Sequence, residues 1–451
     1  MNFMLLRSPR AVRVRGLIKS AAYAFVISVF LVRPGFTQEP SHRNSGTVTP
    51  LADLLKEAEQ NNPQIQAARD GWQAARQVPA QVTALPDPQF QVQQVNVGSP
   101  RPFAGYTNSE FAYVGVGASQ DIPYPGKLKL RGEAAKRDAD IADNRTDSLS
   151  RAVLAEVKAA YFQLAYLEKT LTILNDNGLL LKQIEQAAEA RYRSGLGNQQ
   201  DVLQAQIQQT KLLRDISMHH LEAGKIQTRL KQLLNRPQSA PDIEVASLTE
   251  TPLDTSFDQL FSALQAQNPD LAATQNTIAR DKVRVDAAHK DFYPDFSIGY
   301  MYDRTDPSQF RSYNQITFGI KIPLHHEKQR AELAQAEAEL SRSRNEHAAQ
   351  SQQVASELHQ QYLVAEQTAD LLKIYREGLI PQARAAIEAG LAAYRSNRQD
   401  FPSLLASYLD VLRLEQEKWQ NVADHETALA RLEQMTGLSL RSASAAKENR
   451  P

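Results

Sequence analysis

The sequence predicts a mainly α-helical fold with a small amphipathic β portion, built twice within one chain. Three observations support this prediction: a repeat of short motifs, two very long helix-forming stretches, and two pairs of alternating strands. The repeated motifs, in chain order, are Asn62-Pro63 and Asn268-Pro269, Pro86-Asp87 and Pro294-Asp295, Ile122-Pro123 and Ile322-Pro323, and Tyr192-Arg193-Ser194-Gly195 and Tyr394-Arg395-Ser396-Asn397. Their spacing far exceeds the about 20–50 residues of a solenoid unit, so it indicates a duplicated half.

Composition favours long helices and excludes several classes of function. The 451 residues include only 19 glycines and 22 prolines, and a wealth of Ala, Glu, Leu, Gln and Arg is typical of extended helices. The formal net charge is zero, so nothing indicates nucleic acid as a partner. Because the chain has no cysteine, disulfides, thiolate metal sites, cysteine nucleophiles and a lipid anchor through cysteine are excluded.

The N-terminal segment, residues 1–37, has the features of a secretory signal peptide. A basic region precedes an apolar run from Ala21 to Val32. This run is shorter than the about 20 residues of a membrane-spanning helix and is typical of a signal peptide, with a retained anchor helix as the alternative. Residues 38–50 are expected to form a flexible N-terminus of the mature chain.

Each half predicts the same order of elements: helix, strand, loop, strand, very long helix, tip and returning helix. We assign the first repeat to 51–237, a linker to 238–254, the second repeat to 255–438 and a disordered tail to 439–451. The first repeat is expected to begin with one amphipathic helix from Leu51 to about Val82, since apolar residues recur there at helical spacing.

The strands show a period of two. Phe90 and Val92 alternate with glutamines, and alternation returns at 111–122, 296–303 and 316–322. Strands of about ten residues with one apolar and one polar face are typical of membrane-crossing β-strands. A soluble hairpin packed on a helix fits the same pattern, so the strands alone leave both interpretations open.

Two long helices are expected, at 127–193 and 327–395. Each would be about 100 Å long at 1.5 Å rise per residue, which is too long for an ordinary globular core. Both contain a glycine at a matching place, Gly178 and Gly378, and the second adds Pro381. These positions predict a kink or a change of packing partner.

Four amphipathic strands cannot close a barrel within one chain. An open sheet edge in lipid leaves backbone groups without hydrogen bonds, so several chains would have to pool their strands. About eight strands give a lumen filled by side chains, whereas larger barrels leave a channel. The helices would then extend away from the membrane as a hollow bundle.

This arrangement resembles the TolC-like outer-membrane efflux channel family over about Leu51 to Leu438. The residues that carry the resemblance are the two-fold repeat, the tip motif from Tyr192 to Leu196 with the following Asp201-Val202-Leu203-Gln204, and the junction Ile122-Pro123-Tyr124-Pro125-Gly126-Lys127-Leu128. The resemblance implies a long helical-hairpin α-barrel with four transmembrane strands per chain. It also implies a homotrimer with a 12-stranded barrel in the outer-membrane lipid, extending into the periplasm.

The same resemblance implies the partners and the cargo. We expect a passive conduit that works with a periplasmic adaptor (membrane fusion) protein and an inner-membrane pump of the RND type. The proline-glycine junction is similar to the heavy-metal cation efflux branch. A channel for type I protein secretion is an alternative within the family, and a soluble periplasmic coiled-coil scaffold is an alternative of another class.

The functional positions are expected at the two helical tips. Charged residues of both signs lie there, and ion pairs between them could hold the end of the channel closed. The candidate gating residues are Arg193, Asp201, Arg395, Arg398 and Asp400. Helix capping and solvated charge are the alternative, since carboxylates favour a helix N-terminus. By resemblance, the adaptor contacts are Gly195, Leu196, Asn397 and Phe401.

No catalytic constellation is present in the sequence, so we expect no enzyme, no cofactor and no metal site. The nine histidines are scattered. His219-His220 and His325-His326 are adjacent pairs, and neighbours on a helix diverge. His325-His326 follows a strand, as Tyr124-Pro125 does in the first repeat, and a metal contact there is the alternative.

Overall fold

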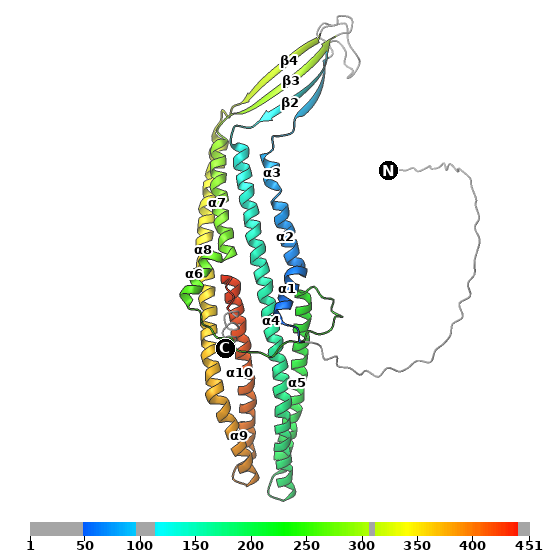
Figure 1. The fold of residues 1–451 in the computed structure, drawn as a ribbon, viewed down its shortest axis with the longest axis vertical. Coiled ribbons are helices and arrows are strands. Elements are labelled where there is room, and N and C mark those ends of the chain that lie inside the picture. Colours follow the sequence, from blue (N-terminus) through cyan, green and yellow to red (C-terminus); the bar gives the residue numbers. More distant parts are fainter. Residues whose placement is uncertain (1–47, 96–112, 306–311, 441–451) are drawn as a thin grey trace, which may run out of the picture. The chain divides into compact units, whose positions relative to one another are not determined.

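The computed structural model describes residues 48–95, 113–305 and 312–440 (Figure 1). The expected signal peptide, nearly all of the expected flexible N-terminus and the residues from 441 onward lie outside the described residues. The first repeat contains α1 (Leu51–Asn61), α2 (Pro63–Ala75), α3 (Val78–Thr83), β1 (Gln89–Val95), β2 (Tyr113–Ile122), α4 (Lys127–Arg193) and α5 (Gln199–Leu233). The second contains α6 (Phe257–Gln267), α7 (Pro269–Lys290), β3 (Asp295–Thr305), β4 (Ser312–Lys321), α8 (Glu327–Ile374), the π-helical turn η1 (Tyr375–Leu379), α9 (Ile380–Arg395) and α10 (Phe401–Thr436).

The single helix expected at 51–82 is wrong, because the chain forms three helices there. Asn62 leaves the helical conformation, with ψ at 122°, and Pro63 starts a new helix. Proline is favoured at a helix start because its missing N–H is not needed there. Pro79 marks the first turn of α3 in the same way.

The repeated Asn-Pro motif makes the same tertiary contact in each half. The Asn62 side chain accepts from the backbone N–H of Gln64 and Ile65, which caps α2, and its amide donates to the carbonyl of Leu233 at 2.8 Å. In the second half Asn268 caps α7 and donates to the carbonyl of Met435 at 3.1 Å. Each asparagine therefore joins the start of a short helix to the end of the returning helix.

The strands form one antiparallel sheet in the order β1-β2-β3-β4. Gln89 lies opposite Ser119, and the equivalent Ser297 lies opposite Gly319, so both hairpins have the same register. The hairpins are joined by β2 and β3, where Ala118 faces Tyr300. Within the described residues β1 and β4 each have one unpaired edge.

The sheet has one exposed apolar face. Residues directly opposite in an antiparallel pair share a face, and the register places Phe90, Val92, Val116, Tyr300, Phe318 and Ile320 together. Phe90 is 83 % exposed and Phe318 is 75 % exposed. On the other face Met301 is buried against Gly117, where a Cβ atom would lie only 2.5 Å from a backbone oxygen.

The long helices appear as expected, but the two matching glycines behave differently. Helix α4 runs 67 residues without a break through Gly178. In the second half the α-helical ladder is interrupted at Gly378 by η1, and α9 follows with Pro381 in its first turn. Proline has no N–H to donate, and a π-helical turn accommodates such an interruption.

Helix α4 is the central element, since it packs against α5, α7 and α10. Apolar side chains from α1, α4, α5, α10 and the linker form a shared core that includes Leu54, Val157 and Leu230. The linker contributes Ile243, whose backbone N–H and carbonyl both bond the Gln227 side chain. The buried Leu440 bonds Glu433, so the described chain continues two residues into the expected tail.

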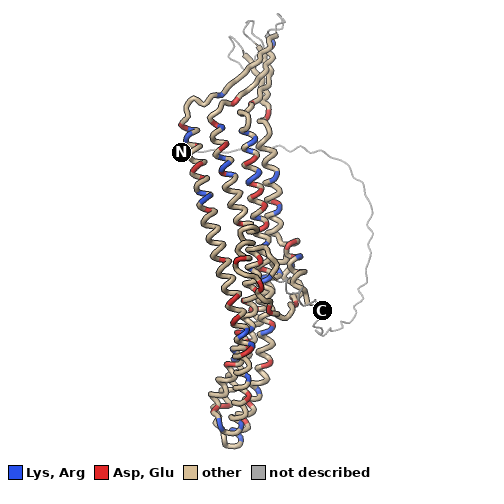
Figure 2. The backbone as a smooth tube through the Cα atoms, turned by 60° about the vertical axis from the view of Figure 1, so that its left-hand side comes forward, with Lys and Arg blue, Asp and Glu red and all other residues tan. Residues whose placement is uncertain are grey.

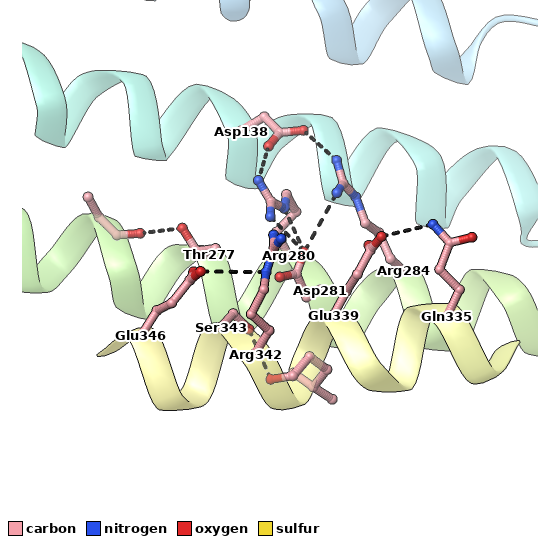
Figure 3. Close-up of polar contacts among 12 residues, drawn as sticks. Asp138, Thr277, Arg280, Asp281, Arg284, Gln335, Glu339, Arg342, Ser343 and Glu346 are labelled. Carbon is pink, nitrogen blue, oxygen red and sulfur yellow. Dashed lines mark hydrogen bonds and ion pairs between the residues drawn. The ribbon is translucent and has the colours of Figure 1, made fainter. Parts of the chain in front are cut away.

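A charged network joins the two repeats between α4 and α7 (Figure 3). Arg280 donates to Asp138 of α4 at 3.1 Å and pairs with the nearly inaccessible Asp281 at 2.7 Å. Arg284 lies 3.6 Å from Asp138. Figure 2 shows that charged residues are spread along the helices and are sparse on the strands. None of the described helices is both long enough and apolar enough to cross a membrane.

Candidate functional site at the helical tips

Both tips turn through a residue in the left-handed conformation. Gly195 has φ at 73° and the equivalent Asn397 has φ at 61°. After Gly195 the backbone N–H groups of Leu196 and Gly197 both bond the carbonyl of Arg191. Glycine and asparagine are the residues that end helices in this way, so the repeated Tyr-Arg-Ser-Gly/Asn motif is a helix stop followed by a tight reversal.

Tyr394 forms the contact between the two tips. Its side chain is 1 % exposed, and its hydroxyl donates to Asp201 Oδ2 on α5 at 2.9 Å. Its ring meets Phe401 edge to face, with centroids 5.7 Å apart. The hydroxyl therefore bonds the first hairpin, while the ring lies in an apolar core that both hairpins share.

Arg191 adds a second set of bonds from the first hairpin to the second. Its guanidinium lies over the Tyr394 ring at 4.4 Å and donates to the Tyr394 carbonyl at 3.0 Å. It also donates to the Asn397 side chain and to the carbonyl of Leu196. Arginine is suited to this position because it can stack on a ring and donate in several directions at once.

The environment keeps the Tyr394 phenol protonated. Burial raises its pKa, and the hydrogen bond to the Asp201 carboxylate and the charge of that carboxylate raise it further, while Arg191 opposes the shift. A protonated phenol is the form that donates to a carboxylate. The electrostatics of the site therefore stabilise the observed contact.

The two tips are not equivalent, although their motifs are. Tyr192 occupies in tip one the position of Tyr394 in tip two, yet it is 47 % exposed. Arg191 corresponds to Ala393, and Asp201 corresponds to Ser403. Arg191 is not among the residues predicted from the sequence, and its difference from Ala393 at the matching position was the available signal.

The predicted gating residues fall into two groups. Asp201 lies in the first turn of α5 and reaches across to tip two. Arg193 is exposed and pairs with Glu189 of its own helix at 2.6 Å. Arg395, Arg398 and Asp400 are exposed, and the described residues hold no ion pair that joins them to another element.

The expected adaptor contacts also divide. Gly195, Leu196 and Asn397 are exposed at the turns. Phe401 is 2 % exposed because it packs against Tyr394, so its side chain is unavailable to a partner in this conformation. A pocket of about 490 Å³ lies between the tips, and its lining includes Arg191, Asp201, Tyr394, Asp400 and Phe401.

A second bridge between the hairpins lies closer to the π-helical turn. The Glu415 carboxylate of α10 accepts from Arg384 of α9 at 3.0 Å and from Asn177 of α4 at 3.1 Å. Tyr375 of η1 donates to Glu417 at 3.1 Å. The π-helical turn thus adjoins residues that connect the two hairpins.

The described residues of one chain contain no group of three side chains of the metal-binding kind. His219 and His220 lie within α5. His326 is the N-cap residue of α8 and His325 precedes it, so the divergence of neighbours on a helix does not apply to this pair.

Comparison with known proteins gives one consistent result. The profile described as Outer membrane efflux protein matches residues 54–236 and 260–438, which together make up most of the chain. The chain is 23 % identical over 377 residues to the pyoverdine export outer membrane protein OpmQ of Pseudomonas putida, covering 79 % of each protein.

Two solved structures share the fold. The outer-membrane channel OprN superposes with a TM-score of 0.76 at 18 % identity, over 87 % of this chain and 90 % of OprN. CusC superposes with a TM-score of 0.74 at 17 % identity, over 89 % of this chain and 96 % of CusC. The expected fold class is thereby confirmed. The family match and the outer-membrane relative confirm the expected location, the outer membrane with an extension into the periplasm. The chain belongs to the outer membrane efflux protein family and is an outer-membrane efflux channel subunit.

Proposed function

We propose that three copies of this chain form the outer-membrane channel of a tripartite efflux system. The observation that carries the proposal is the open sheet: β1 and β4 each have one unpaired edge, and one face of the sheet is exposed and apolar. In hydrocarbon such edges must be paired. Three copies of four strands would close a 12-stranded barrel with a lumen.

The internal repeat predicts how neighbouring copies would pair. The contact between β2 and β3 joins the end of the first repeat's sheet to the start of the second. Its counterpart between copies would join β4 to β1 of the next copy. Ala118 corresponds to Phe318 in the second repeat, and Tyr300 corresponds to Val92 in the first. The observed pair of Ala118 and Tyr300 therefore predicts that Phe318 lies opposite Val92 of the next copy.

The tips would form the closed end of the conduit. Hydrogen bonds and stacking through Tyr394, Asp201 and Arg191 hold the two hairpins of one copy together. Such contacts provide no energy source, so transport through the channel would be passive. An inner-membrane pump, which we propose is of the RND type, would drive it.

The periplasmic adaptor would bind at the exposed turns. Gly195 and Leu196 of tip one and Asn397 of tip two lie at the surface beside the contact that closes the hairpins. Arg193, Arg395, Arg398 and Asp400 would present both charge signs to this adaptor. A partner that bound here could compete for Arg191 or Asn397 and release the tips.

Heavy-metal cations remain our proposal for the cargo, supported by the junction from Ile122 to Leu128. The relative OpmQ exports pyoverdine, according to its name, which makes a siderophore-like organic molecule the second candidate. A deletion strain separates the two. Loss of tolerance to copper, zinc, cobalt or silver salts is expected, and loss of siderophore export with unchanged metal tolerance would contradict metal cargo.

Fractionation tests the channel itself. The protein should be recovered from outer-membrane fractions and should migrate as a trimer on an unheated gel. Recovery as a monomer from the soluble periplasm would contradict the proposed function.

A further inference from the structure

The junction that leads from β2 into α4 is held by an ion pair to the second repeat. Lys127 is only 5 % exposed, and its Nζ lies 2.9 Å from Asp295 Oδ1. The same carboxylate accepts the backbone N–H of Tyr124 at 2.8 Å. Asp295 also lies opposite Lys321 in the sheet. The Asp295 carboxylate therefore has two lysines, Lys127 and Lys321, as neighbours.

The second repeat has the equivalent junction between β4 and α8, but no other described part of the same chain covers its residues. Glu327 corresponds to Lys127, and Leu324 corresponds to Tyr124. Both Glu327 and Leu324 are exposed in the single chain. The residue that corresponds to Asp295 is Asp87, at the same Pro-Asp motif before β1, and it is exposed too.

The register shows which surface would cover this junction. Ile122 lies opposite Phe296 where β2 pairs with β3. The corresponding residues in the other repeat are Ile322 and Pro88, so Ile322 is expected opposite Pro88 of the next copy. Asp87 of the next copy would then lie beside residues 324–327, as Asp295 lies beside residues 124–127. This step rests on the trimer of the proposed function.

At this second junction carboxylates occupy both lysine positions, and the aspartate position keeps its carboxylate. Where Lys127 meets Asp295, Glu327 would meet Asp87 of the neighbouring copy. Where Lys321 lies opposite Asp295, the first repeat has Asp121. Carboxylates brought within about 4–6 Å of one another repel unless a proton or a cation lies between them.

A histidine beside these carboxylates could supply a nitrogen ligand to a metal ion. His325 comes directly before the N-cap of α8, outside the helix, and is exposed. His326 is stacked on Phe292 at 5.6 Å, which leaves His325 as the available imidazole. One imidazole with two carboxylates is a ligand set that suits zinc and neighbouring divalent transition metals better than magnesium or calcium.

We propose that a divalent transition-metal ion binds between neighbouring copies, held by His325 and Glu327 of one copy and by Asp87 of the next. A single chain would supply only part of this ligand set, since Asp87 comes from a neighbouring copy. The ion would take the place that the Lys127 ammonium group has in the first junction. It would thereby stabilise the trimer.

The test uses the full chain, purified as a trimer in detergent and stripped with a chelator. Titration with zinc chloride, followed by calorimetry and by thermal stability, should show about one ion per chain and a raised melting temperature. His325→Ala, Glu327→Gln and Asp87→Asn should each weaken zinc binding by roughly tenfold or more, since each removes a ligand. His220→Ala, at an exposed histidine of α5, is the matched control and should bind zinc as the natural chain does.

Glu327→Lys is the decisive variant. It would recreate the Lys127–Asp295 pair between copies, so the trimer should remain stable while zinc no longer binds or stabilises it. Equal zinc affinity in this variant and in the natural chain would overturn the inference while leaving the trimer intact. A chain that is monomeric under all conditions would contradict the proposed function itself, so the two failures are distinguishable.

Discussion

At the residue scale, a single hydroxyl connects the two hairpins at the tips. The Tyr394 phenol is buried and donates to the partly exposed Asp201. A hydrogen bond to a charged group contributes about 1.5–3 kcal/mol, which is more than an exposed ion pair such as Arg193–Glu189 provides. The contact between the two hairpins therefore depends more on this tyrosine than on the exposed charges.

Tyr394→Phe should weaken closure while keeping the ring in the core. If the bond contributes about 1.5 kcal/mol, the open fraction should rise by about tenfold. Single-channel conductance in planar bilayers measures this change. Tyr192→Phe is the matched control, because the equivalent hydroxyl in tip one belongs to an exposed side chain; equal effects of both variants would contradict the assignment.

Arg191→Ala should open the tips more than Arg193→Ala does. Arg191 bonds Tyr394 and Asn397 of the other hairpin, whereas Arg193 pairs within its own helix. Entry of a bulky antibiotic into intact cells is a suitable measurement. Greater antibiotic entry with Arg193→Ala than with Arg191→Ala would contradict the role of the Arg191 guanidinium in holding the two hairpins together.

The contact of Tyr394 should resist alkaline conditions. Its pKa is raised in the folded chain, chiefly by burial and then by Asp201, so its stabilising contribution is complete below the ordinary phenol pKa of about 10 and is lost as pH rises through the higher folded value. The difference in melting temperature between the natural chain and Tyr394→Phe should be constant from about pH 7 to about pH 9.5 and narrow at higher pH. A difference that shrinks between pH 7 and pH 9 would be contrary to this expectation.

The sequence predicts part of the tip site. Asp201 and the turn motifs are found by repeat and resemblance, because they depend on local chemistry. The role of Arg191 and the burial of Phe401 depend on how two hairpins distant in sequence pack together. Charge near a turn could not show which side chains reach across it.

At the element scale, the two capping asparagines carry both local and tertiary order. Each accepts N–H groups at a helix start and donates to the end of a returning helix. The Asn-Pro repeat was visible in the sequence as a motif. The three helices in place of one were missed, because helical spacing continues across Asn62 and only the cap geometry separates α1 from α2.

Asn62→Ala should lower the free energy of unfolding by about 2 kcal/mol, since it removes an N-cap and a tertiary hydrogen bond of about 1 kcal/mol each. Asn62→Ser keeps a capping hydroxyl but is too short to reach Leu233, so about half of the loss is expected. Thermal denaturation in detergent compares the two. An unchanged free energy of unfolding in Asn62→Ser would show that the bond to Leu233 contributes nothing, and equal losses in both variants would show that the cap contributes nothing.

At the scale of the whole molecule, the repeat explains why one chain leaves surfaces open. Contacts between the two halves within the chain have counterparts that only another copy can supply. Lys127 is buried where the second half covers it, and Glu327 is exposed where the next copy would lie. The repeat and the strand period are present in the sequence, so the fold class could be predicted; the register of β2 with β3 could not, because it is set by packing between the halves.

The most direct test of the trimer is a disulfide between β4 of one copy and β1 of the next. Residues directly opposite in an antiparallel pair have Cβ atoms about 4.5–5.5 Å apart, and the chain contains no cysteine of its own. Val92→Cys combined with Phe318→Cys should therefore form disulfides between copies, visible as a covalent trimer on a non-reducing denaturing gel. Gln93→Cys with Phe318→Cys, on opposite faces, should stay monomeric on the same gel. Monomers from the matched pair, or equal cross-linking of both pairs, would contradict the proposed closure of the sheet.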